Sequence, residues 1–107
     1  MSTAPKSEIL SLAALTEYQT GTIVSRQVTK AEGGNVTLFA FDEGQELSEH
    51  TTPFEAFVQV LDGEVEIKIS GKPYLLEAGE GIIMPANAPH ALLARKKFKM
   101  LLTMIKA

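Results

Sequence analysis

The sequence contains no cysteine and no tryptophan, and only two of its 107 residues are histidine. Without cysteine, the chain forms no disulfide scaffold and carries out no thiol chemistry. No run approaches the roughly 20 apolar residues of a membrane-spanning helix. The opening residues MSTAPKSEIL lack the basic and apolar regions of a secretory signal. We therefore expect a cytoplasmic protein that does not bind membranes.

Positive charge is also scarce. Ten Lys and Arg residues are set against thirteen Asp and Glu, which gives a net charge of −3. Nucleic acids bind basic surfaces, so we expect no nucleic-acid partner. Eight acids and no Lys or Arg lie between Asp42 and Glu66, whereas five bases and no acid follow from Arg95 onward. Such segments either line solvated turns or pair with each other, within or between subunits.

From Thr22 onward, apolar and polar residues alternate with the period of two that is typical of strands. The segment EVEIKIS is the clearest case, with Val65, Ile67 and Ile69 on one face. Turn signals recur about every eight to twelve residues, and Asp62-Gly63 predicts a hairpin. The pattern predicts about eight or nine strands, and hence an all-β sandwich or barrel such as the jelly roll.

The chain divides into an N-terminal tail or arm, residues 1–20, and a single barrel domain, residues 21–107. Within the arm, Ile9–Tyr18 is rich in apolar residues. It is either one short helix or an extended arm, and its periodicity does not distinguish the two.

The last predicted strand, FKMLLTMI, is apolar on both faces, with Leu101 and Ile105 on the face opposite the other apolar residues. Two apolar faces indicate burial on both sides. A barrel of this size covers only one of them, so we expect a second copy of the chain to cover the other and predict a homodimer.

Both histidines lie where strands meet turns. Pro85 ends a predicted strand, and the turn after it delivers His90 to the start of the next strand. His50, Thr52 and Ala56 lie at even offsets, so they share one face if the strand is regular.

The spacing of glycines, proline and histidines resembles the two motifs of the cupin superfamily. The first family motif is glycine, five residues, His-x-His, three or four residues, Glu, six residues and glycine. The second is glycine, five residues, Pro-x-Gly, two residues, His, three residues and Asn. The matching positions are Gly44, His50 and Gly63 for the first motif and Gly79, Pro85 and His90 for the second. The resemblance covers about residues 33–105 and implies a double-stranded β-helix, the small RmlC-like jelly-roll barrel. It also implies that His50, Thr52, Ala56 and His90 line a ligand pocket inside the barrel.

The resemblance also implies a metal held by the two His and the Glu of the first motif and the His of the second. Here Thr52 stands at the second His position and Ala56 at the Glu position, so His50 and His90 form an incomplete metal site. Glu46, an even step from His50, is a candidate replacement ligand. Because Zn, Mn, Fe or Ni usually needs three or more protein ligands, we expect weak metal binding or none.

Three classes of function remain open. In the first, the barrel binds a small molecule, or weakly a metal, through His50 and His90. The alternative is a metal-dependent cupin enzyme of the dioxygenase, isomerase or decarboxylase type. A purely structural barrel is disfavoured because both motif histidines are retained. No G-x-S-x-G nucleophile motif is present, and no residue is assigned a catalytic role.

Overall fold

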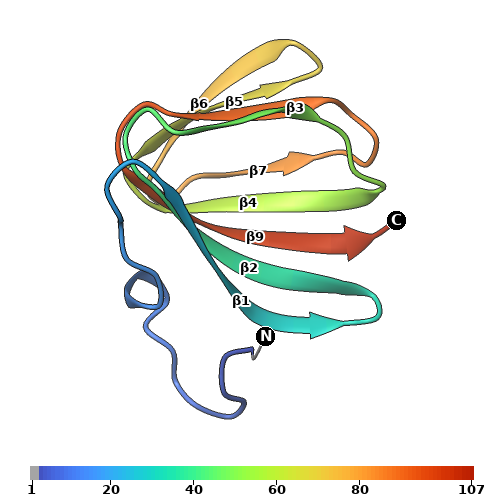
Figure 1. Cartoon of the computed structure of the whole chain (residues 1–107). Coiled ribbons are helices and arrows are strands. Elements are labelled where there is room, and N and C mark those ends of the chain that lie inside the picture. The colour runs from blue at the N-terminus through green and yellow to red at the C-terminus, as the bar shows by residue number, and fades with distance from the viewer. Residues whose placement is uncertain (1–2) are drawn as a thin grey trace.

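A computed structural model describes residues 3–107 of the chain. Within these residues, nine strands form two facing sheets (Figure 1). The strands are β1 (Ile23–Ala31), β2 (Gly34–Phe41), β3 (Glu46–His50), β4 (Phe54–Asp62), β5 (Glu64–Ile69), β6 (Lys72–Glu77), β7 (Gly81–Met84), β8 (His90–Ala94) and β9 (Phe98–Lys106). The first sheet has the order β1-β2-β9-β4-β7 and the second β3-β8-β5-β6, with every neighbouring pair antiparallel.

The core lies between the two sheets and is built from alternate residues of each strand. On β5, Val65 and Ile67 are buried in this core, whereas Glu66 and Lys68 are not part of it. The same alternation on β9 buries Phe98 and Met100. The predicted all-β double-stranded β-helix is therefore confirmed.

The predicted hairpin at Asp62-Gly63 is wrong, because β4 belongs to the first sheet and β5 to the second. Gly63 instead turns the chain around a corner between the sheets, with φ +77°. A Cβ atom at this position would lie 1.7 Å from the carbonyl oxygen of Lys97, so only glycine fits against the neighbouring backbone. The turn at Gly71, by contrast, joins paired strands, since β5 and β6 form a ladder.

The N-terminal arm (residues 3–20) is irregular except for one turn of 3₁₀ helix, η1 (Leu12–Ala14). It is attached near both ends. The Ala4 N–H donates to the Val28 carbonyl at 2.9 Å, and the Tyr18 hydroxyl donates to Asp62 at 2.6 Å. No helix in residues 3–107 is both long and apolar enough to cross a membrane.

One end of the barrel, which we call the mouth, holds two connections between the sheets. These are the segments from His50 to Phe54 and from Met84 to His90, at the right of Figure 1. The Asn87 N–H donates to the Thr52 carbonyl at 2.8 Å and so ties the two connections together. The mouth is therefore formed by two connections that are hydrogen-bonded to each other. One begins at His50 and the other ends at His90.

Candidate functional site

The two histidines lie side by side at the mouth. His50 is the last residue of β3 and His90 the first of β8, and the two are directly opposite each other in the strand register. Their ring centroids are 4.3 Å apart, with an interplanar angle of 69°. His90 is only 4% exposed, whereas His50 is open to solvent. The pair thus joins a buried imidazole to an accessible one.

Each ring is oriented by a backbone carbonyl two residues before it. His50 Nδ1 lies 2.8 Å from the Ser48 oxygen, and His90 Nδ1 lies 3.1 Å from the Ala88 oxygen. Because a carbonyl oxygen only accepts hydrogen bonds, Nδ1 carries the proton in both rings. In the neutral rings, Nε2 is therefore the atom left with a lone pair, free to accept a hydrogen bond or bind a cation.

Burial lowers the pKa of His90 below its ordinary value of 6.5. The hydrogen bond to the Ala88 carbonyl opposes this shift, and the neighbouring His50 adds to it. His90 is thus predominantly neutral near pH 7, with its Nε2 lone pair available.

Glu46 does not share a face with the histidines, so the prediction that it faces His50 is wrong. Its register partner is Leu93, whereas His50 pairs with His90. On β8, His90 and Leu92 are buried toward the core, so Leu93 and Glu46 lie on the outer face. The register shifts between Leu47 and His50, and this irregularity breaks the even-step rule on which the prediction depended.

The predicted common face of His50, Thr52 and Ala56 on one strand is also wrong. β3 ends at His50, Thr52 lies in the connection, and Ala56 belongs to β4 in the opposite sheet. The Thr52 hydroxyl accepts a hydrogen bond from the Phe54 N–H at 3.3 Å, so it helps to shape the connection. Ala56 is buried in the core at the mouth end of the facing sheet. The roles of both residues in ligand binding stay predictions.

The facing sheet contributes a row of inward-pointing residues at the mouth. Ala56 is directly opposite Met84 on β7 and Met104 on β9, and Met104 is opposite Asn35 on β2. Asn35 is a polar group that the motif spacings do not identify. Its place in the alternation Asn35, Thr37, Phe39 is the sequence signal that could have found it, because Phe39 packs on the core.

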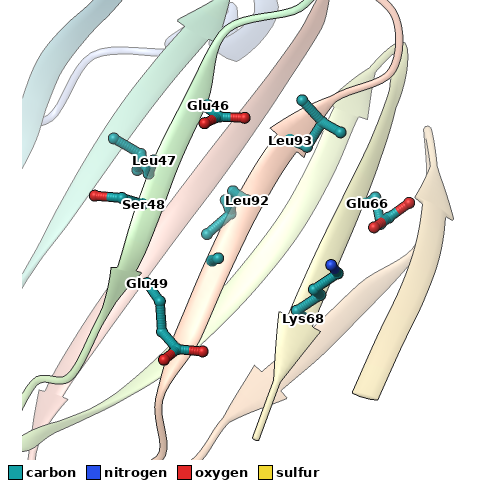
Figure 2. A pocket seen from close by; sticks show the side chains of 9 residues that line it. Glu46, Leu47, Ser48, Glu49, Glu66, Lys68, Leu92 and Leu93 are labelled. Atoms are coloured by element: carbon teal, nitrogen blue, oxygen red, sulfur yellow. The ribbon is translucent and has the colours of Figure 1, made fainter. Parts of the chain in front are cut away.

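A separate hollow of about 310 Å³ lies on the outer face of the second sheet. Figure 2 shows Glu46 and Glu49 from β3 on one side of β8 and Glu66 and Lys68 from β5 on the other. At its edge, Arg95 forms an ion pair of 3.0 Å with Glu66, which joins the basic and acidic segments within one chain. This surface is distinct from the histidine pair, which lies on the inner side of the same sheet.

The donor atoms at the mouth do not complete a transition-metal site. Across residues 3–107, no group of three or more His, Cys, Asp or Glu side chains is placed to hold a metal ion. The histidine pair supplies two Nε2 atoms, whereas stable zinc sites have at least three protein ligands. The family's usual metal therefore does not fit the residues present in this chain.

Known proteins similar to this chain share its fold. A conserved protein of unknown function from Streptococcus pyogenes has a TM-score of 0.91 and 34% identity, over 100% of this chain and 96% of that one. A cupin 2 conserved barrel domain protein from Leptotrichia buccalis has a TM-score of 0.88 and 41% identity, over 91% of this chain and 47% of that one.

A curated relative named polyketide synthase CurC, from Streptomyces cyaneus, is 30% identical over 70 residues, or 64% of this chain. The match covers 46% of that protein, so the chain spans just under half of its length. The sequence profile described as "Cupin domain" matches residues 37–106, which is well over half of the chain. On that match and on the fold, the chain belongs to the cupin domain family.

Proposed function

We propose that this cupin binds a small molecule at the barrel mouth through the Nε2 atoms of His50 and His90, without a resident metal. The observation that carries the proposal is the pair of rings 4.3 Å apart, each with Nδ1 bonded to a backbone carbonyl. This arrangement supports binding because both hydrogen-bond acceptors are oriented before a ligand arrives.

The surroundings suggest the chemical class of the ligand. His90 is buried, and burial keeps it neutral, so its Nε2 accepts a hydrogen bond from a hydroxyl or N–H donor. The facing row at the mouth is largely apolar, with Ala56, Met84 and Met104. A ligand with an apolar body and a donor group at one end fits both features.

A metal-dependent enzyme would need at least one further ligand. The positions at which the family pattern has its second His and its Glu hold Thr52 and Ala56 in this chain, and Glu46 lies on the outer face. No feature of the described residues compensates for these losses, so the enzyme alternative receives no support from the site.

Phenol, an apolar ring with one hydroxyl donor, is a suitable probe. Because the chain has only two histidines, ¹⁵N spectra of ring-labelled protein resolve each Nε2 separately. We expect phenol to cause saturable chemical-shift changes at both Nε2 atoms of metal-free protein. The change at His50 should be lost in His90→Asn, because asparagine keeps a donor for the Ala88 carbonyl but has no Nε2. Glu46→Gln, on the outer face, is the matched control and should respond like the unmodified protein.

Elemental analysis of protein purified without an affinity tag tests the metal-free part of the proposal. We expect well under one transition-metal ion per chain. Near-stoichiometric metal that disappears in His50→Asn and His90→Asn would contradict the proposal and support the metal-dependent alternative.

A further inference from the structure

The inner face of the first sheet is partly open to solvent near the mouth. Four inward-facing residues, which we call the inner patch, are only half-buried: Asn35 and Thr37 on β2 and, directly opposite them, Met104 and Leu102 on β9. Both apolar members pack against the core between the sheets, so the inner patch faces the interior of the barrel. By contrast, Ala56, the next residue of the same row on β4, is buried. Solvent, and therefore a ligand, reaches the interior of the barrel beside β2 and β9.

The inner patch lies across the barrel from the histidine pair. At the end away from the mouth, β2 continues into β3 and β8 continues into β9, and the order β2-β9 in the first sheet matches the order β3-β8 in the second. Thus β2 faces β3 and β9 faces β8. His50 and His90 lie at the mouth ends of β3 and β8, and Asn35 and Met104 lie near the mouth ends of β2 and β9. Asn35 is therefore a polar group on the opposite side of the same interior.

The amide of Asn35 is oriented by its neighbour on the same face. The Thr37 hydroxyl donates to Asn35 Oδ1 at 3.4 Å, which engages the acceptor atom of the amide. Nδ2, which only donates hydrogen bonds, has no partner among residues 3–107. The mouth thus presents a donor at Asn35 and, at the neutral histidines, the opposite polarity, because their Nε2 atoms accept.

We infer that the ligand of the histidine pair carries a neutral hydrogen-bond acceptor in addition to its donor, and that Asn35 Nδ2 binds this acceptor. The inference rests on the ligand site proposed above and adds the second polar group of its ligand. The chemical class is a small, largely apolar molecule with a hydroxyl or N–H group at one end and a carbonyl oxygen at the other. Asn35 determines specificity, and Thr37 is a positioning residue that acts through it.

The composition of this interior favours a neutral acceptor over a carboxylate. The inner patch contains no charged side chain, and neither do Ala56 and Met84, which continue its outermost row. Burial also keeps His90 neutral. A carboxylate would lose hydration here without gaining a cation, which is costly, whereas a carbonyl oxygen needs only the N–H of Asn35.

Two phenols that differ at the acceptor position test the inference. 4-Hydroxyphenylacetone carries a carbonyl oxygen where 4-isobutylphenol carries a methyl group. Both keep the hydroxyl donor for the histidine pair, and a methylene separates the ring from the varied position. Titrations followed by the ¹⁵N signals of His50 and His90 give a dissociation constant for each probe in metal-free protein.

The variant Asn35→Leu removes the amide and keeps a side chain of similar size. It should weaken binding of the ketone by about 3- to 10-fold, the value of one hydrogen bond, and should not weaken binding of 4-isobutylphenol. Thr37→Val should produce a smaller loss, again for the ketone alone, and serves as the test if Asn35→Leu fails to fold, as judged by circular dichroism. The matched control is Thr103→Val, because Thr103 lies opposite the exposed Phe57 on the outer face of the same sheet. It should leave both dissociation constants unchanged.

The asparagine side chains give a second readout that does not depend on affinity. The chain has only two asparagines, Asn35 and Asn87, so selective ¹⁵N labelling yields two side-chain amide signals, and Asn35→Leu identifies one of them by its loss. At saturation, the ketone should shift the Nδ2 signal of Asn35 more than 4-isobutylphenol does, because only the ketone accepts a hydrogen bond. Equal shifts would contradict the inference.

The titrations distinguish failure of this inference from failure of the proposed ligand site. If both probes shift the histidine signals but Asn35→Leu changes both dissociation constants by the same factor, the inference is overturned and the ligand site stands. If neither probe shifts the histidine signals of the unmodified protein, the ligand site fails and the inference fails with it. A loss confined to the ketone supports both.

Discussion

A backbone carbonyl fixes the proton position of each histidine at the mouth. Ser48 accepts from His50 Nδ1 and Ala88 accepts from His90 Nδ1. Both carbonyls precede their histidine by two residues, so each ring is oriented by its own local segment. Ligand binding therefore does not have to select a tautomer, which lowers its cost.

The lowered pKa of His90 makes folding stability depend on pH. In the unfolded chain a histidine binds its proton near pH 6.5, whereas folded His90 binds it only at lower pH. Between these two values the unfolded state holds more protons, so the free energy of unfolding falls as the pH falls. In metal-free protein, the urea concentration at the midpoint of unfolding should decrease as the pH is lowered from about 7.5 to about 5.5.

The variant His90→Asn should lack most of this decrease, because asparagine does not titrate in this range. His50→Asn is the control and should keep it, since the nearby His50 is the last of the causes acting on the pKa of His90. Equal slopes in the unmodified protein and His90→Asn would contradict the prediction.

The sequence identified the two histidines of the site but not the residues that surround them. The motif spacing selects His50 and His90, and the structure brings their rings together. Period-two counting failed for Glu46 and Ala56, because the first lies across an irregular register and the second across a break between sheets. Local spacing describes faces only within one regular strand.

At the scale of the elements, Gly63 forms a corner between the sheets at which two backbone segments approach closely. Its φ is +77°, and a Cβ atom there would lie only 1.7 Å from the Lys97 oxygen, so both the backbone conformation and the available space exclude larger residues. Gly63→Ala should lower the free energy of unfolding by about 3 kcal/mol or more, because strain and a backbone clash add together.

Gly71 provides the matched control for this substitution. Its φ is +83°, but a Cβ atom there would meet nothing within 4 Å. Gly71→Ala should therefore cost only the left-handed backbone term, about 1–2 kcal/mol. Chemical denaturation of both variants measures the difference, and equal losses would contradict the role given to the Lys97 contact.

The alternation of apolar residues predicted the strands well but not their sheets. Asp62-Gly63 marks a change of direction correctly, yet β4 and β5 enter different sheets there because their hydrogen-bond partners differ. The segment Arg95–Lys97 likewise joins β8 of one sheet to β9 of the other. Turn residues indicate where a strand ends, whereas pairing depends on non-local contacts.

At the scale of the whole molecule, β9 separates the two apolar environments of the chain. Met100 is buried in the core between the sheets, whereas Ile105, on the outer face of the first sheet, is 52% exposed. The two-faced sequence of this strand predicted a second cover, and the arm supplies it at one end only. The homodimer predicted from the sequence would cover the other end, and it would couple the stability of the fold to the concentration of the chain.

This coupling predicts a melting temperature that depends on protein concentration. If unfolding and dissociation occur together, a tenfold dilution changes the free energy of the dimer by about 1.4 kcal/mol, which lowers Tm by roughly 3–6 °C for an assembly of this size. Ile83 is 56% exposed on β7 of the first sheet, opposite Phe57. Ile83→Glu should therefore disrupt the dimer and melt at the same temperature at every concentration, because a single chain unfolds without a partner. The matched control is Leu75→Glu, because Leu75 is 59% exposed on β6 of the second sheet. This variant should follow the unmodified protein. Differential scanning calorimetry over a hundredfold range of concentration measures all three, and a constant Tm for the unmodified protein would contradict coupled unfolding of a dimer.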